Sequence, residues 1–193
     1  MIFLQGSCKG LTLIYLGGDA YPDEADCEKR LAWALATSNS FSFISQSSVL
    51  TDKDLMSGDW RRIPHRLNQL EALVNEIDDE VILIGRSSGA RVATLFACYH
   101  KVSAVICLGY PFQAPDQDPD EDRFRHLADI KVPTLVIQGV RDNYGGCEVV
   151  DRYKLSESVE LCFINVDHEF NLSSPALEEV INKVRLFITA NCY

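Results

Sequence analysis

The sequence predicts an α/β protein with a mostly parallel sheet and helices on both of its faces. Two observations carry this prediction. Short apolar segments alternate along the chain with segments whose apolar residues recur every three or four positions, which are the patterns of strands and amphipathic helices. Several of the short segments are unbroken apolar runs, as expected of strands that are buried on both faces. For a chain of 193 residues we expect one domain, spanning residues 1–193.

The first 60 residues begin with a strand and a glycine turn. The apolar segment 11–16 predicts a strand that ends in Gly17-Gly18-Asp19, where two glycines are free to adopt positive φ. A helix is predicted over residues 23–38 and a strand over 40–45, and the polar segment 51–60, which contains a glycine, is expected to be a loop. The residues that indicate the helix are the apolar Cys27, Leu31, Ala34 and Leu35 on one face and the acidic Asp23, Glu24 and Asp26 near its start.

The middle of the chain continues the alternation. A helix is predicted to begin at Pro64, followed by a strand at residues 81–84, a helix at 90–99 and a strand at 102–108. Segment 114–122 is rich in proline and aspartate and is expected to be an exposed loop, because a solvated surface explains its charge better than a metal site does. The first of these helices is indicated by apolar residues three and four positions apart: Ile63, Leu67, Leu70, Val74 and Ile77.

The last third of the chain repeats the same pattern. We expect, in order, a helix over residues 123–130, a strand over 133–138, a helix over 147–155 and a strand over 159–166. A final helix is predicted to begin with Ser174 as its N-cap and Pro175 as its first helical residue. Its buried face is expected to consist of Leu177, Val180, Ile181, Val184, Phe187 and Ile188.

The composition argues against several classes of partner. A net charge of −10 and an isoelectric point near 4.8 disfavour binding to nucleic acid or to an anionic membrane surface. No apolar run approaches the roughly 18 residues that a membrane span needs, and the N-terminus lacks the basic region of a signal peptide. The phosphate-binding motifs G-x-G-x-x-G and G-x-x-x-x-G-K-[ST] are absent from the sequence. We therefore expect neither a nucleic-acid nor a membrane partner.

The cysteines indicate a reducing compartment. The chain has seven, an odd count without a C-x-x-C pair, which is a poor disulfide framework and a poor zinc site. Cys98, Cys107 and Cys162 fall inside apolar runs and are expected to be small core residues. We therefore predict a cytoplasmic protein without a bound metal.

The motif with the most chemical content is G-x-S-x-G at Gly85–Gly89. It follows the buried strand predicted at residues 81–84 and precedes the helix predicted at 90–99, which is the context in which this motif forms a nucleophile elbow. Small residues on either side of the serine let strand and helix approach closely enough to hold its hydroxyl above the sheet edge. We interpret Ser87 as a nucleophile; the alternative is an ordinary Gly/Ser loop.

Two further polar residues follow predicted strands, as Ser87 does. Because functional sites of parallel sheets form at the carboxyl ends of the strands, we asked which polar side chains come directly after them. These include Ser87, Asp142 and His168, in the order Ser…acid…His, with separations of 142 − 87 = 55 and 168 − 142 = 26 residues. Each therefore comes from a different strand end, and the three are expected to meet.

The chemistry of acyl transfer needs these residue types. A serine hydroxyl becomes a good nucleophile when a base removes its proton, and an imidazole does so near neutral pH. A carboxylate fixes the tautomer of the imidazole and stabilises its charged form. The tetrahedral oxyanion also needs donors placed in advance. We expect the backbone N–H of Ser88 to be one of these donors and that of Gly18, in the first glycine turn, to be the other.

Each assignment has a structural alternative. Asp142 lies in the turn-prone sequence Arg-Asp-Asn, so its alternative role is a turn cap, but its position after a strand favours the role of the acid. Asp167 is a weak rival as the acid, because its side chain cannot easily turn to meet the ring of the adjacent His168. The other histidines lie in predicted helices and are expected to be surface or packing residues: His65, His100 and His126. Arg86, Arg91 and Arg141 are candidates to line the cleft, although solvated or structural roles are favoured for them.

At these residues the chain resembles the α/β-hydrolase superfamily, and most closely its small, dienelactone-hydrolase-like members without a large lid. The resemblance rests on Gly85–Ala93, the turn Gly109-Tyr110-Pro111-Phe112 and residues 125–142, and with the first turn and the His168 region it spans most of the chain. It implies an α/β-hydrolase fold, Ser87 as nucleophile, Asp142 as acid, His168 as base, and no cofactor. The first turn departs from the family's usual His-Gly pattern, since it reads Leu16-Gly17-Gly18-Asp19.

Two functions of different classes therefore fit the sequence. The first is a serine hydrolase that cleaves a carboxylic ester or thioester of a small molecule through an acyl-enzyme, in an open cleft with one wall formed by residues 109–122. The second is a catalytically silent binding or interaction protein on the same fold, motivated by the altered first turn and the acidic loop. A Rossmann-like small-molecule binder is disfavoured because it leaves the Ser, Asp, His order as a coincidence. The sequence does not specify an oligomeric state.

Overall fold

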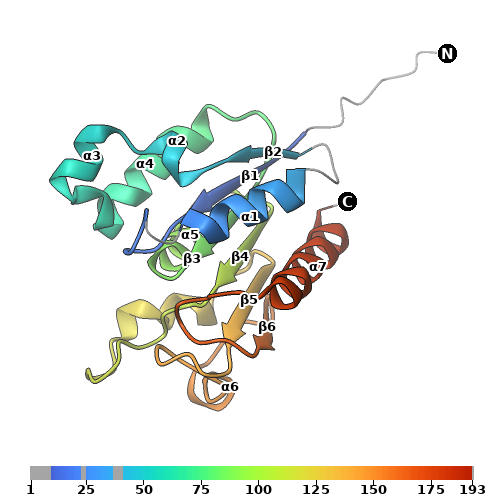
Figure 1. Ribbon diagram of the computed structural model, residues 1–193. Coiled ribbons are helices and arrows are strands. Elements are labelled where there is room, and N and C mark those ends of the chain that lie inside the picture. The colour runs from blue at the N-terminus through green and yellow to red at the C-terminus, as the bar shows by residue number, and fades with distance from the viewer. Residues whose placement is uncertain (1–9, 23–24, 37–40, 193) are drawn as a thin grey trace.

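The core of the protein is a six-stranded sheet in which all strands run parallel. We analysed a computed structural model, which describes residues 10–22, 25–36 and 41–192. The strand order is β2-β1-β3-β4-β5-β6 (Figure 1). The strands are β1 (Leu11–Leu16), β2 (Phe41–Ile44), β3 (Glu80–Arg86), β4 (Ala104–Leu108), β5 (Thr134–Gly139) and β6 (Val159–Ile164). The predicted α/β class and the six predicted strands are confirmed.

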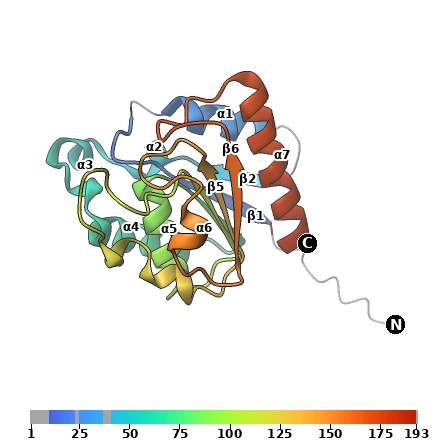
Figure 2. The same ribbon diagram turned by 90° about the horizontal axis from the view of Figure 1, so that it is seen from below.

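Helices cover both faces of this sheet, as predicted. On one face lie α1 (Ala25–Ala36) and α7 (Ser174–Asn191), and on the other lie α4 (Ile63–Asn75) and α5 (Ser88–Ala97). Figures 1 and 2 show the sheet between these two layers. Two separate apolar clusters result, because side chains alternate between the faces along each strand. Every residue of β1, β4 and β5 is buried, which explains why β4 is an unbroken apolar run and why β1 and β5 are apolar apart from Thr12, Thr134 and Gln138.

The chain reverses its direction of travel across the sheet between β1 and β3. From β1 it passes through α1 to β2 at one edge, and it then returns to place β3 on the other side of β1. The loops that follow β1 and β3 therefore diverge, which leaves room for a ligand between them. Residues 17–21 and the start of α5 border this crevice.

The expectation of a loop at residues 51–60 is wrong. The structure has the helices α2 (Gln46–Val49) and α3 (Asp52–Ser57) and the 3₁₀ turn η1 (Asp59–Arg61) in this region. The reason is local hydrogen bonding rather than apolar periodicity. Thr51 caps α3 by accepting from the Asp54 N–H, the Asp54 carboxylate accepts from the Thr51 N–H in return, and Gly58 ends the helix at φ 71°.

Three other predictions need correction. Residues 121–128 form two 3₁₀ turns, η2 (Glu121–Arg123) and η3 (Arg125–Ala128), instead of one α-helix, and α6 is shorter than expected at Val149–Arg152. The N-cap of α7 is Ser173, whose hydroxyl accepts from the Ala176 N–H, so Ser174 already lies inside the helix. The parts of the helix and strand predictions that fall on residues 23–24 and 37–40 lie outside the described residues, as does Cys8.

His126 on η3 packs against α5 and is the histidine with the most perturbed pKa. Its Nε2 lies 2.9 Å from Thr94 Oγ1. Burial, with a further contribution from the charge of Arg91, lowers the pKa of His126 to about 4 from an ordinary value of 6.5. The fold therefore favours the neutral imidazole.

Because of His126, the stability of the protein is expected to decrease as the pH decreases. Below pH 6.5 the unfolded chain binds a proton that the folded chain takes up only near pH 4, so stability present above pH 6.5 is lost as the pH drops between these values. Between pH 7.5 and 5 we expect a loss of about 1 to 2 kcal/mol, after allowing for the partial exposure of the ring. Urea denaturation at both pH values should show a smaller loss of unfolding free energy in His126→Gln than in the wild type. His65→Gln, which replaces a half-exposed ring, should show the same loss as the wild type.

Candidate active site

Ser87 occupies a strained turn between β3 and α5. Its backbone has φ 50° and ψ −119°, a conformation that residues other than glycine rarely adopt. The Ser87 N–H donates to the Leu108 carbonyl of the neighbouring strand at 3.1 Å, which fixes the turn to the sheet. The predicted strand, turn and helix around the motif are all present.

The two glycines of the motif are required by close packing. A Cβ on Gly85 would lie 2.4 Å from Cα of Ala90, and a Cβ on Gly89 would lie 2.0 Å from the Leu16 carbonyl oxygen of β1. No side chain fits at either distance, so the approach of α5 to β3 and β1 depends on glycine at both positions.

The structure brings Ser87, His168 and Asp142 into one hydrogen-bonded row. Ser87 Oγ lies 2.9 Å from His168 Nε2, and His168 Nδ1 lies 2.9 Å from each Asp142 carboxylate oxygen. Because a carboxylate only accepts, Nδ1 must carry the proton, and Nε2 is left as an acceptor for the serine hydroxyl. Asp142 and His168 are 4% and 8% exposed, so this row is shielded from water except near Ser87.

The carboxylate of Asp142 is held by groups around it. Gln138 Nε2 lies 3.0 Å from Asp142 Oδ2, and the Tyr144 N–H donates to Asp142 Oδ1 at 2.8 Å. The ring of Tyr144 stacks on that of His168 with centroids 4.0 Å apart. The guanidinium of Arg86 donates to the His168 carbonyl oxygen. These contacts hold the carboxylate of Asp142 and the ring of His168 in fixed positions.

Gln138 is expected to contribute strongly to stability, because its fully buried amide has several partners at once. Its Oε1 also accepts from the Tyr110 N–H at 2.8 Å, and its Nε2 donates to the Gly145 carbonyl oxygen at 2.6 Å. Gln138→Leu leaves these buried groups unpaired, and we expect it to lower the free energy of unfolding by about 2 to 4 kcal/mol in urea denaturation. The exposed Gln117, replaced in the same way, should change it by less than about 0.5 kcal/mol.

The turn after β1 is fixed by two side chains from outside it. The Gly17 N–H donates to Gln46 Oε1 at 3.0 Å, and Arg66 Nη2 donates to the Gly17 carbonyl oxygen at 2.6 Å. Arg66 is a buried residue of α4, and its Nη1 also donates to Ser88 Oγ at 3.1 Å. The Ser88 hydroxyl in turn donates to Asp19 Oδ1 at 2.7 Å. The negative charge of Asp19 is thus linked through Ser88 to the positive charge of Arg66.

Ser87 and His168 open into a pocket of about 360 Å³, which we call the Ser87 pocket. Ser88 lines it and presents the first turn of α5, whereas the residues contributed by the turn after β1 are Asp19 and Ala20. Gly18 is buried and is not among the lining residues, so its assignment as an oxyanion donor stays a prediction. The lining residues are Asp19, Ala20, Arg86, Ser87, Ser88, Arg91, Pro111, Ala114, Gln117, Arg123, Tyr144, His168 and Glu169. Three of them come from the loop 109–122, which forms one wall as expected.

Three residues of this region were not anticipated from the sequence. The sequence does mark Gln138 and Arg66, because each is a polar residue that interrupts a mostly apolar strand or helix face. Tyr144 carries none, because its role depends on the stacking geometry. Of the three arginines considered, Arg86 and Arg91 line the Ser87 pocket.

The remaining polar residues lie outside the row. Arg141 is exposed and bonds to Asn165, and the exposed Asp167 has no part in the row. The other histidines pack elsewhere: His65 near Asp54, His100 on the ring of Phe96 and His126 against Thr94.

The described residues include neither a cluster of metal ligands nor a membrane-spanning helix. In residues 10–22, 25–36 and 41–192, no three His, Cys, Asp or Glu side chains gather in a way that would hold a metal ion. Among the helices of that same part of the chain, none combines the length and the apolar character needed to cross a bilayer.

Comparison with known proteins identifies the family. The family model described as an alpha/beta hydrolase domain matches residues 40–185, which is most of the chain. The protein belongs to the α/β-hydrolase family. No curated protein matches this α/β hydrolase in sequence.

Solved structures share the fold of this α/β hydrolase at low sequence identity. A dienelactone hydrolase from Anabaena variabilis is 20% identical with a TM-score of 0.65, and the match covers 96% of this chain and 88% of the other. A putative hydrolase of the α/β superfamily from Xanthomonas campestris is 17% identical with a TM-score of 0.61, covering 90% and 98%. The metagenomic α/β hydrolase MGS-MChE2 is 17% identical with a TM-score of 0.67, covering 96% and 93%.

Proposed function

We propose that this protein is a serine hydrolase that cleaves a carboxylic ester or thioester of a small molecule through an acyl-enzyme. The observation that carries the proposal is the row of hydrogen bonds from Ser87 Oγ through His168 to Asp142, with both spacings at 2.9 Å. The three side chains follow β3, β6 and β5, so the sheet itself holds them in place. In this proposal residues 1–193 form one catalytic domain.

The first half of the reaction forms the acyl-enzyme. Ser87 Oγ attacks the carbonyl carbon while His168 Nε2 accepts the hydroxyl proton, and the carbonyl electron pair moves to oxygen. Asp142 stabilises the imidazolium that results. When the tetrahedral intermediate collapses, the bond to the alcohol or thiol breaks, and His168 returns the proton to that leaving group. The acyl group stays on Ser87.

The second half uses water in place of the alcohol. His168 removes a proton from the water, whose oxygen attacks the acyl carbon, and Ser87 then leaves and regains its proton. The carboxylic acid is released. Ser87, His168 and Asp142 supply the nucleophile, the base and the acid, so these steps need no cofactor.

The developing oxyanion requires donors beside Ser87. The Ser88 N–H at the start of α5 is the first, since it is a free first-turn amide of a helix of ten residues. The second is proposed to be the Gly18 N–H in the turn that Arg66 and Gln46 fix. The carboxylate of Asp19, which would oppose an oxyanion, accepts from the Ser88 hydroxyl, and that hydroxyl accepts in turn from Arg66 Nη1.

Asp19 is also the observation that favours the second candidate function. It places a carboxylate in the Ser87 pocket, where an oxyanion would form. A catalytically silent binding protein on the same fold would tolerate this charge, and it would bind its ligand without acyl transfer. The two functions differ in whether Ser87 reacts.

A covalent probe tests the reactivity of Ser87 directly. Incubation with a fluorophosphonate should label the folded wild type at Ser87 by mass spectrometry, and Ser87→Ala should remain unlabelled. Ser57→Ala removes an exposed hydroxyl on α3 and should be labelled like the wild type. An unlabelled wild type with a cooperative unfolding transition would exclude the serine hydrolase and leave the silent protein as the account.

A further inference from the structure

The Ser87 pocket contains two arginines that the proposed reaction does not use. Arg91 lies on α5, four residues after Ser87 and therefore one helical turn from it. Arg123 ends η2 and lines the same pocket from the opposite loop. Both belong to a chain whose net charge is −10, so cations in this pocket are not explained by the overall composition.

Arg91 has no partner of its own among the described residues. No carboxylate of residues 10–22, 25–36 and 41–192 lies within ion-pair distance of its guanidinium, and in this part of the chain its Nε is buried without a hydrogen-bond acceptor. Burial lowers the pKa of Arg91, and the nearby charge of Arg123 acts in the same direction. An arginine remains charged in proteins regardless. A half-buried guanidinium that is unpaired and lies beside a second one is unfavourable until an anion joins them.

The carboxylates that attract Arg91 are already engaged. Asp19 and Asp120 both act on its pKa in the opposite direction, but each has a closer partner. Asp19 accepts from the Ser88 hydroxyl at 2.7 Å, and Asp120 lies 3.4 Å from Arg123 in an ion pair. The donors of the Arg91 guanidinium therefore remain available to a ligand.

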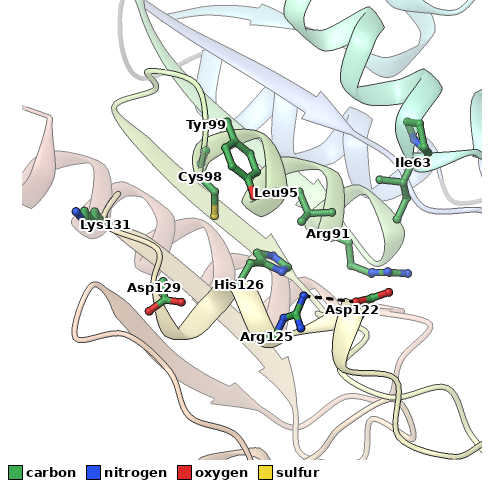
Figure 3. A pocket seen from close by; sticks show the side chains of 12 residues that line it. Ile63, Arg91, Leu95, Cys98, Tyr99, Asp122, Arg125, His126, Asp129 and Lys131 are labelled. Carbon is green, nitrogen blue, oxygen red and sulfur yellow. Dashed lines mark ion pairs between the residues drawn. The ribbon is translucent and has the colours of Figure 1, made fainter.

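Figure 3 shows Arg91 from the side of a neighbouring hollow of about 760 Å³. The side chain leaves α5 and points into this hollow above Asp122, and the ion pair drawn there joins Asp122 to Arg125 rather than to Arg91. Arg91 lines both this hollow and the Ser87 pocket, so its guanidinium lies at the boundary between them. A group bound by Arg91 is thus within the reach of a molecule that also contacts Ser87.

We propose that the substrate carries a carboxylate, which Arg91 binds together with Arg123 while the ester lies at Ser87. This inference rests on the proposed function, because it names the class of substrate for the same site. A carboxylate matches the planar donor pair of a guanidinium. It also supplies the single negative charge that the guanidinium of Arg91 needs as a partner. A doubly charged phosphate monoester fits less well, since Asp19 and Glu169 also line the pocket.

A matched pair of esters tests the proposal. The 4-nitrophenyl half-ester of adipic acid has a free carboxylate at its far end, and the corresponding methyl diester is neutral. We expect the wild type to prefer the half-ester by about tenfold in kcat/KM, and Arg91→Gln to remove this preference. Arg91→Lys keeps the charge and should retain part of it. Arg125→Gln removes an exposed arginine that does not line the Ser87 pocket and should leave the preference unchanged.

The outcomes separate this inference from the proposed function. Hydrolysis that depends on Ser87 but shows equal kcat/KM for the two esters would overturn the carboxylate site and leave the hydrolase standing, as would an equal loss for both esters in Arg91→Gln. If neither ester is hydrolysed, titration of Ser87→Ala with monomethyl adipate, followed by NMR, decides the matter. Binding that weakens about tenfold when Arg91→Gln is added supports the site, and no binding refutes it.

Discussion

Replacing His168 by alanine is expected to lower kcat for short 4-nitrophenyl esters by at least about 10⁴-fold. The reason is that His168, the proposed base, has its Nε2 2.9 Å from Ser87 Oγ. Asp142→Asn should cost about 10⁴-fold as well, because an amide that donates to Nδ1 forces the wrong tautomer on the ring. Stopped-flow measurements under single-turnover conditions would show whether the loss of rate lies in the acylation step.

The control for His168 is another histidine. His65 is half-exposed on α4 and lies far from the row, so His65→Ala should change kcat by less than about twofold. The free energy of unfolding of His168→Ala should be measured in parallel, since a loss of activity counts only if the variant is folded. Activity of His168→Ala within tenfold of the wild type would contradict the assignment of His168 as the base.

The sheet and the hydrogen-bonded row of Ser87, His168 and Asp142 were predictable for the same physical reason. Strands covered on both faces are mostly apolar on both of their sides, so β1, β4 and β5 stand out in the sequence. Polar residues that interrupt the pattern directly after such strands must then lie at the carboxyl edge of the sheet. Ser87, Asp142 and His168 are therefore predicted to lie together, and the spacings of 2.9 Å along the row agree with this prediction.

What could not be predicted depends on single contacts rather than on periodicity. Helix α3 exists because Thr51 and Asp54 cap one another, a pattern that apolar spacing does not reveal. The buried Arg66 and Gln138 are polar residues on core faces, and their partners are backbone atoms of distant turns. A sequence shows that such a residue interrupts a face, but it does not show which turn the side chain reaches.

The replacement with the largest expected effect on stability is Gly89→Ala. A Cβ at this position would lie 2.0 Å from the Leu16 carbonyl oxygen and 2.7 Å from that of Gly17, and both are backbone atoms that cannot rotate away. We expect a loss of about 3 kcal/mol or more in the free energy of unfolding, measured by urea denaturation. Gly58→Ala is the matched control, since its Cβ meets nothing closer than 3.8 Å and only its φ of 71° is strained. It should cost about 1 kcal/mol.

The same replacement also affects the proposed active site, because Gly89 lies between its two proposed oxyanion donors. Gly89 is the second residue of α5, and the atoms it approaches begin the turn that is proposed to hold the oxyanion. An alanine there must push α5 and β1 apart, which separates the Ser88 N–H from Gly18. Gly89→Ala should therefore lose fluorophosphonate labelling even under conditions in which it is folded, whereas Gly58→Ala should keep it. A folded Gly89→Ala variant labelled at the wild-type rate would show that the approach of α5 to β1 is not what positions the two donors.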